Sequence, residues 1–144
     1  MLVQQILKGK GTQGVVTIPS DITVSQAVEV LSKKKIGAVI VSDDGERPLG
    51  ILSERDIVKS LGVQGTASLS QNVKDQMTSN LVSCVASDTA DNVLEKMTQG
   101  RFRHMPVMDE DKMIGLISIG DVVKARLSEL SMEKDALEGM IKGF

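Results

Sequence analysis

The sequence contains no tryptophan and no tyrosine, and it has only two phenylalanines and one histidine. Proteins that bind single-stranded nucleic acid usually stack the bases on aromatic side chains. The formal net charge is −2, so the chain has no overall positive charge to attract a polyanion. Both features argue against a nucleic-acid-binding protein, although a small basic pocket remains compatible with them.

Cysteine occurs once, at Cys84, which excludes an intramolecular disulfide. This residue lies within the apolar run Leu81–Val85. A cysteine in such a run is typical of a buried structural thiol rather than a reactive one.

Long apolar runs are also missing. No window holds the roughly 18 consecutive apolar residues that a membrane span needs, and the start Met1–Lys8 is too polar for a signal peptide. The rest of the composition, 41% hydrophobic and 25% charged, is typical of one compact globular module over residues 1–144. We therefore expect a soluble, cytoplasmic protein without membrane contact.

The strongest positive feature is an internal repeat. The segment Thr23–Glu29 aligns with Thr89–Glu95, 66 positions later. With one slip in a turn, this spacing also aligns Thr12 with Thr78, Val16 with Val82, Val39–Asp43 with Met105–Asp109, and Gly50–Asp56 with Gly115–Asp121. We predict a first repeat over 10–62, a second over 72–128, and a C-terminal helical extension over 128–144.

Each repeat is predicted to fold as helix, strand, strand, helix. Thr23 and Gln26 form a capping-box pattern ahead of apolar residues spaced as one helix face. The β-branched run Ala38–Val41 predicts a strand buried on both faces. The other expected elements are extended pieces at Val15–Ile18 and Val82–Val85, strands at Leu49–Leu52, Met105–Met108 and Ile114–Ile117, and helices beginning after Ser53, from Ala90 and from Ile119.

The fold class is therefore mixed α and β, with two repeats that each place two helices on a short, mostly antiparallel sheet. A short sheet with helices on one side leaves its other face bare, and a second copy can cover that face. We expect the copies to pair about a pseudo-two-fold axis. Such pairing would form two equivalent clefts where the extended segment of one copy meets the strand-to-helix turn of the other.

The turns Gly50–Asp56 and Gly115–Asp121 share one pattern: glycine, two apolar residues, serine, two variable residues, aspartate. Serine and aspartate in this spacing form a capping box, which is a purely structural explanation. The glycine would let another backbone approach the strand. A structural cap would be duplicated along with the repeat just as a binding site would. The pattern therefore leaves both interpretations open.

Together with Val73–Thr78 and Arg103–Asp109, these two turns resemble the tandem CBS-domain pair, also called a Bateman module. The resemblance covers about Thr12 to Leu127. The chain is most similar to small bacterial proteins that consist only of this module. The resemblance implies a regulatory energy sensor that binds an adenosine nucleotide and has no resident cofactor or metal.

The resemblance also implies the binding residues. The aspartates would accept hydrogen bonds from the ribose hydroxyls, and the serines would lie near ribose or phosphate. Residues before the strand proline line the phosphate in the gamma subunit of AMP-activated protein kinase. One site then comprises Thr12, Val16, Arg103, His104, Met105, Pro106, Ser118, Ile119, Gly120 and Asp121; the other comprises Thr78, Val82, Ala38, Ser53, Arg55 and Asp56.

The two sites differ in charge. The second repeat offers Arg101, Arg103 and His104, whereas the first has Gly37 and Ala38 at the matching positions and Arg55 as its nearest cation. Because phosphate favours arginine contacts, we rank the Asp121 site above the Asp56 site. His104 lacks the neighbouring ligands of a metal site, so its alternatives are packing and a phosphate contact.

From Ile119 to Met140 the apolar spacing predicts one amphipathic helix or two, longer than the repeat requires. This tail could brace a homodimer of the kind common in the family. A regulated protein partner in trans is also implied.

The leading functional hypothesis is a nucleotide sensor whose ligand changes its conformation or association. AMP is the first candidate ligand, and ADP, ATP, NADH and S-adenosylmethionine are the others. The alternative is a structural or interaction module with unoccupied clefts. An enzyme is disfavoured, because the sequence shows no nucleophile paired with a base, no P-loop and no metal-ligand spacing.

Overall fold

The computed structural model describes residues 1–10 and 14–143. The chain divides into two compact units. The first unit contains Gly14–Val82 and Asp109–Ile114, and the second contains Met1–Gln13, Ser83–Met108 and Gly115–Phe144. Thus each unit holds most of one predicted repeat and takes a segment from elsewhere in the chain.

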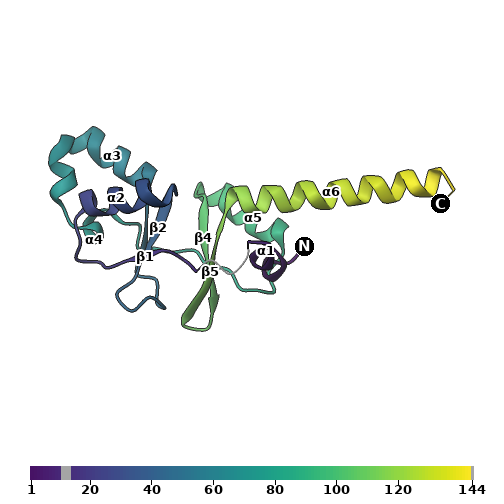
Figure 1. The fold of residues 1–144 in the computed structure, drawn as a ribbon, viewed down its shortest axis with the longest axis horizontal. Coiled ribbons are helices and arrows are strands. Elements are labelled where there is room, and N and C mark those ends of the chain that lie inside the picture. The colour runs from purple at the N-terminus through teal and green to yellow at the C-terminus, as the bar shows by residue number, and fades with distance from the viewer. Residues whose placement is uncertain (11–13, 144) are drawn as a thin grey trace. The chain divides into compact units, whose positions relative to one another are not determined.

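Both halves of the chain contain the predicted order of helix, strand, strand and helix: α2, β2, β3 and α3 in the first, and α5, β4, β5 and α6 in the second (Figure 1). The elements are α1 (Val3–Gly9), β1 (Thr17–Ile18), α2 (Val24–Lys34), β2 (Ala38–Val41), β3 (Gly50–Ser53), α3 (Glu54–Gln64), the 3₁₀ helix η1 (Gly65–Ser70), α4 (Val73–Gln76), α5 (Ala90–Gly100), β4 (His104–Asp109), β5 (Lys112–Ser118) and α6 (Ile119–Ile141). The mixed α and β class with small sheets is confirmed.

The first unit is built on a three-stranded sheet in the order β1-β2-β3. Strand β1 runs parallel to β2, with Thr17 opposite Ile40, and β2 runs antiparallel to β3, with Ala38 opposite Ser53. All four residues of β2 are buried, as the unbroken apolar run predicts. The core comprises Ile18, Val24, Ala27, Leu31, Val39, Val41, Leu52, Ile57 and Val73.

Helix α2 begins at the predicted capping box. The Gln26 amide donates to Thr23 Oγ1 (3.2 Å), and the Thr23 amide donates to Gln26 Oε1 (2.9 Å). These bonds satisfy two of the amides that a helix N-terminus leaves without partners. At its other end Lys35 adopts a left-handed conformation (φ 55°), which ends the helix.

The second unit contains most of the two-stranded sheet β4-β5, whose hairpin end is the segment Asp109–Ile114 of the first unit, together with helices α5, α6 and α1. The strands are joined by the two-residue turn Glu110–Asp111, a connection that only antiparallel strands permit. The core comprises Val3, Ile6, Cys84, Ala90, Val93, Met97, Met105, Val107, Ile117, Val122 and Ala125. Helix α1, which the sequence analysis does not predict, contributes two of these residues.

Cys84 is buried, as predicted, and its amide donates to the Pro106 carbonyl (3.0 Å). Burial raises the pKa of the Cys84 thiol to about 11, with a smaller contribution from the Asp88 carboxylate. The thiolate is therefore scarce at neutral pH, and the residue serves packing.

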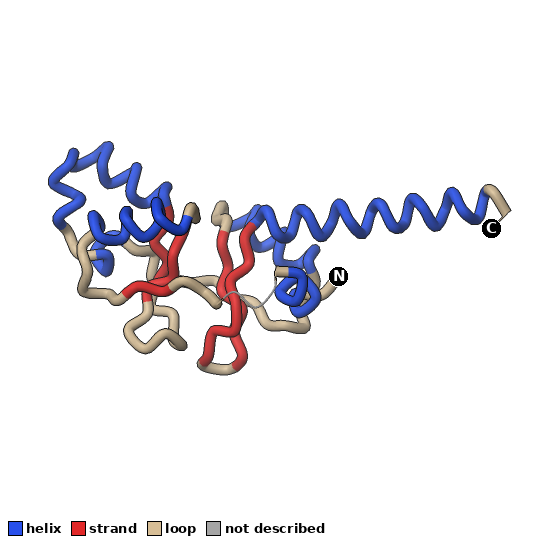
Figure 2. Tube along the Cα trace, in the orientation of Figure 1, coloured by secondary structure: helices blue, strands red, loops and turns tan. Residues whose placement is uncertain are grey.

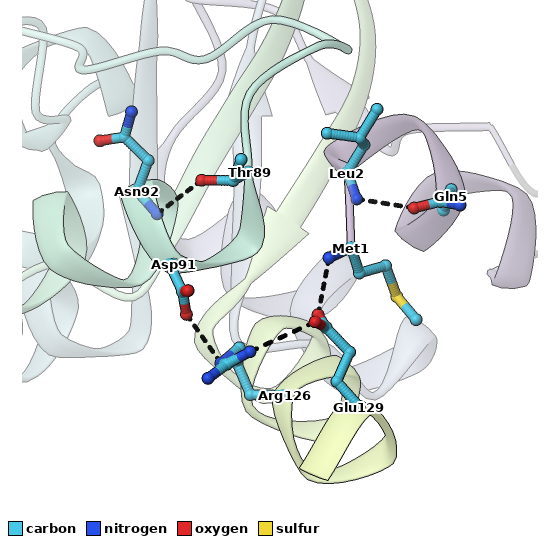
Figure 3. Close-up of polar contacts among 8 residues, drawn as sticks. All are labelled: Met1, Leu2, Gln5, Thr89, Asp91, Asn92, Arg126 and Glu129. Carbon is cyan, nitrogen blue, oxygen red and sulfur yellow. Dashed lines mark hydrogen bonds and ion pairs between the residues drawn. The ribbon is translucent and has the colours of Figure 1, made fainter. Parts of the chain in front are cut away.

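A network of ion pairs holds the start of the chain against α5 and α6 (Figure 3). The Met1 amino group lies 2.8 Å from Glu129 Oε1. Arg126 lies between two carboxylates, with Nε 2.7 Å from Asp91 Oδ1 and Nη1 3.3 Å from Glu129 Oε2. The hydrogen bond from the Met1 amino group lowers the pKa of Glu129, and burial only partly opposes it.

Helix α6 is one continuous helix of 23 residues, and its C-terminal half extends away from the remainder of the second unit (Figures 1 and 2). Only Val122 and Ala125 of this helix are buried. Even at this length, α6 lacks the apolar character of a membrane span, as does every other helix in the described part of the chain.

Candidate functional site

Both strand-to-helix turns form capping boxes. At the first, the Ser53 amide donates to Asp56 Oδ2 (3.0 Å) and the Asp56 amide donates to Ser53 Oγ (3.3 Å). At the second, the Ser118 amide donates to Asp121 Oδ2 (2.9 Å) and the Asp121 amide donates to Ser118 Oγ (3.1 Å). The structural interpretation of the motif is therefore confirmed.

Capping still leaves acceptor capacity on both aspartates. Each uses Oδ2 for the cap, and neither Oδ1 accepts a hydrogen bond from a residue that the structure describes. A carboxylate has about four acceptor positions. The cap therefore fixes each carboxylate at a helix N-terminus without excluding a ligand.

Equivalent backbone hydrogen bonds place the start of a strand beside each turn. The Glu54 amide donates to the Gly37 carbonyl (2.9 Å), and the Ile119 amide donates to the Arg103 carbonyl (2.8 Å). The backbone of Arg103 therefore lies beside the turn of Asp121, with His104 next to it in the chain; their contact with a phosphate stays a prediction. We call Lys10, Arg103, His104 and the turn Ser118–Asp121 the Asp121 site, because all of them belong to the second unit.

Some predicted site residues pack into the interior. Met105 is fully buried in the core of the second unit, and Pro106 is buried with its carbonyl bonded to Cys84. Ala38 is likewise buried in β2. These positions support the turns through packing, and a ligand would meet their backbone more readily than their side chains.

The segment around Thr78 pairs with β3, the strand that leads into the turn of Asp56. The Thr78 amide donates to the Ile51 carbonyl (2.8 Å), and the Ile51 amide donates to the Thr78 carbonyl (2.9 Å). A Cβ atom at Gly50 would lie 2.9 Å from the Thr78 carbonyl oxygen, so the glycine permits this approach. Thr78 thus lies along the strand that leads into Ser53 and Asp56, in the first unit.

The remaining predicted contacts are placed as follows. Val82 belongs to the first unit and is 43% exposed. Val16 also belongs to the first unit, where it packs on the core and accepts a hydrogen bond from the Ile40 amide (3.4 Å). Thr12 lies outside the described residues. The assignment of Val16 and Thr12 to the Asp121 site stays a prediction.

Lys10 is a site residue that the sequence analysis missed. Its Nζ lies 2.8 Å from Asp121 Oδ2 and donates to the Leu116 carbonyl at 2.8 Å. Burial acts to raise the pKa of Asp121, but hydrogen bonds from Lys10 and Ser118 outweigh it and hold the pKa below its ordinary value. The sequence did contain a signal for this residue. The repeat spacing of 66 aligns Lys10 with the uncharged Gln76, so this position carries a cation in only one of the two repeats.

The charge difference between the turns is larger than the sequence indicated. A Cβ atom at Gly37 would lie 2.8 Å from Glu54 Oε1, so this carboxylate lies beside the strand at the first turn. Its counterpart at the second turn is the uncharged Ile119. The first turn therefore carries an added negative charge where the second gains the positive charge of Lys10.

No group of three or more His, Cys, Asp or Glu side chains suited to a metal ion occurs among residues 1–10 and 14–143. The Asp121 site contains a carboxylate held by a helix cap, the basic residues Lys10 and Arg103, and one histidine. Such a set can bind hydroxyl groups and an anion together.

Comparison with known proteins identifies the family. Residues 11–63 and 72–128 each match the CBS domain. The chain belongs to the CBS-domain family. A CBS-domain containing protein from Agrobacterium tumefaciens has a similar structure, with a TM-score of 0.83 and 48% identity over 88% of this chain and 99% of that one.

Other CBS-domain proteins extend the comparison. The mitochondrial CBS domain-containing protein CBSX3 of Arabidopsis thaliana is 36% identical over 94% of this chain and 68% of its own length. Two more distant structures share the CBS fold at 23% identity. One, from Pyrobaculum aerophilum, is complexed with AMP (TM-score 0.76, covering 92% of this chain and 99% of that one). The other, the CBS pair of protein MJ0100, is complexed with 5′-methylthioadenosine and S-adenosylmethionine (TM-score 0.77, 90% and 98%).

Proposed function

We propose that this CBS-domain protein is a regulatory module that binds an adenosine nucleotide, with AMP as the first candidate, at the Asp121 site. The observation that carries the proposal is the Asp121 carboxylate, which the Ser118 cap holds in place beside the Lys10 ammonium, with the Arg103 backbone next to the same turn. CBS domain pairs of the same fold are complexed with AMP, S-adenosylmethionine and 5′-methylthioadenosine, which supports an adenosine ligand.

Each part of the site has a role in this proposal. Asp121 accepts hydrogen bonds from the two ribose hydroxyls, and a carboxylate has the two oxygens that this requires. Arg103 and His104 contact the phosphate, for which arginine provides paired donors. The Asp56 site, with Glu54 beside it, is the weaker of the two for a phosphate-bearing ligand.

The proposed output is a change in conformation or association rather than a reaction. A ligand can shift a protein between two states only if it binds them with different affinity. Cys84 is buried and protonated at neutral pH, and we assign no catalytic role to any residue. We further propose a cytoplasmic location and a protein partner that responds to the ligand-bound form.

Thermal unfolding with a ligand panel tests this proposal. The panel comprises AMP, ADP, ATP, NADH and S-adenosylmethionine, with GMP as the control for base identity. A ligand at about 100 times its dissociation constant adds about 2.7 kcal/mol to the unfolding free energy. In a protein of this size that raises the Tm by about 5 °C or more. A cooperatively folding protein that no panel member stabilises would instead be the interaction module with empty clefts.

We also propose that the protein is a homodimer joined through the C-terminal half of α6. Helix α6 exposes a stripe of apolar side chains that begins in its first half and continues through its C-terminal half, at Val123, Leu127, Leu130, Leu137 and Ile141. Their spacing places them on one helix face. A stripe of this kind on an extended helix can bury itself against the same stripe of a second copy in a self-complementary two-fold contact.

The double variant Leu130→Lys and Leu137→Lys is expected to be monomeric at concentrations where the unmodified protein is dimeric. Lysine at both positions would bury charge in the proposed contact, which costs several kcal/mol. Light scattering after gel filtration measures the mass. The matched control is Glu133→Lys, on the same helix but outside the stripe, which should remain dimeric. A monomeric unmodified protein would exclude this contact.

A further inference from the structure

The ion pair between Lys10 and Asp121 occupies the carboxylate that the proposed function assigns to ribose. Lys10 Nζ lies 2.8 Å from Asp121 Oδ2, and the two side chains are 42% and 24% exposed. The same oxygen also accepts the Ser118 amide. The backbone amide cannot leave without breaking the helix cap, so the lysine is the exchangeable partner.

This arrangement is confined to one of the two turns. The residue equivalent to Lys10 in the repeat is Gln76, whose Nε2 donates to the Ser68 carbonyl (2.8 Å) and to Gln71 Oε1 (2.9 Å). Asp56 forms no ion pair with any residue in the described part of the chain. Lys10 is therefore a feature of the Asp121 site alone and does not follow from the duplicated fold.

We propose that Lys10 makes the Asp121 site selective for adenosine ligands that carry a phosphate over neutral adenosine ligands. The inference rests on the proposed function of the site. Two ribose hydroxyls need both carboxylate oxygens, so a bound ribose competes with Lys10 for Oδ2. A neutral ligand removes Lys10 from its carboxylate and offers no anion in return. A ligand with a 5′-phosphate offers the displaced ammonium a new partner.

The position of Lys10 permits this exchange. Its side chain is a flexible four-carbon stem with three rotatable donors, so the charge can move while the backbone stays. Its hydrogen bond to the Leu116 carbonyl is to a neutral acceptor and can be replaced by water. Arg103, which directly precedes β4 and whose carbonyl bonds to the turn, would be a second cation for the same phosphate. Lys10 thus weakens the binding of a neutral ligand and adds a favourable contact for a ligand with a phosphate.

The test compares AMP with 5′-methylthioadenosine by isothermal titration calorimetry on the unmodified protein and on Lys10→Met. In the variant, AMP loses a charge-assisted contact worth about 10-fold, or about 1.4 kcal/mol, but it no longer displaces an ion pair, so its net affinity is expected to fall by about 3-fold or less. Methylthioadenosine is expected to bind about 3-fold to 10-fold more tightly, because it no longer displaces an ion pair. Because the displacement affects both ligands alike, the ratio of the two affinities should change by the value of the phosphate contact, about 10-fold.

Two matched variants complete the experiment. Lys8→Met removes the same charge from an exposed position of α1 that forms no ion pair with a described residue, and it should leave the ratio unchanged. Lys10→Arg keeps the cation and should retain the preference for AMP. If Lys10→Met changes both affinities by the same factor, or neither, the selectivity role is wrong although the site stands. If the unmodified protein binds neither ligand, the proposed function itself fails, and this inference with it.

Discussion

AMP is expected to bind Asp121→Asn about 100-fold more weakly than it binds the unmodified protein. Asparagine keeps an oxygen for the Ser118 amide, so the start of α6 should remain capped. It loses the negative charge and one of the two acceptor oxygens that the ribose hydroxyls would use. A 100-fold loss corresponds to about 2.7 kcal/mol, within the range for hydrogen bonds to a charged group. Titration calorimetry measures the affinity.

The matched variant at the other turn is Asp56→Asn. Its Ser53 cap has the same geometry, yet Glu54 lies beside it and no lysine reaches it in the described structure. We expect this variant to retain the AMP affinity of the unmodified protein within about 3-fold. The ranking of the sites would be reversed if Asp56→Asn abolished binding while Asp121→Asn preserved it.

Gly50→Ala is expected to lower the free energy of unfolding by about 2 kcal/mol, the usual cost of overpacking a close contact. The new methyl group would lie 2.9 Å from the Thr78 carbonyl oxygen and 2.5 Å from the Met77 sulfur. The sulfur can move aside, but the carbonyl is held by the hydrogen bond from the Ile51 amide. Urea unfolding measures the loss, which corresponds to a Tm lower by about 4–8 °C.

The equivalent glycine of the second repeat provides the control. A Cβ atom at Gly115 would lie 2.6 Å from Leu7 Cδ2, the end of a flexible side chain with no backbone atom among its nearest neighbours. Leu7 can adopt another rotamer, so we expect Gly115→Ala to cost less than about 1 kcal/mol. An equal or larger loss at Gly115 would show that side-chain adjustment, rather than backbone approach, decides the requirement for glycine.

The features that the sequence predicted correctly depend on residues close together in the chain. The caps at Thr23, Ser53 and Ser118 each involve a partner three residues later, so their spacing is visible without a structure. The strand Ala38–Val41 is equally local, because burial on both faces requires an unbroken apolar run. The repeat then extended each local prediction to the second half.

The features that the sequence did not predict depend on distant partners. Helix α1 has only Val3 and Ile6 as buried residues within a polar segment, and their contacts lie in the second repeat. The contact between Lys10 and Asp121 spans 111 residues. Glu54 was visible as a variable position of the motif, but its approach to Gly37 depends on how the strand meets the helix. Spacing rules cannot supply contacts of this kind.

The assembly of the second unit from both ends of the chain has a consequence for its biosynthesis. Val3 and Ile6 leave the ribosome long before Val122 and Ala125, their partners in one core. Most core residues of the first unit lie in one continuous stretch of chain and are synthesised together. The core of the second unit is complete only after α6, the last helix, has been synthesised. Contacts so distant in sequence are slow to form. Until α6 emerges, α1 lacks the part of its core that Val122 and Ala125 supply, and the unfinished unit is open to chaperones and proteases.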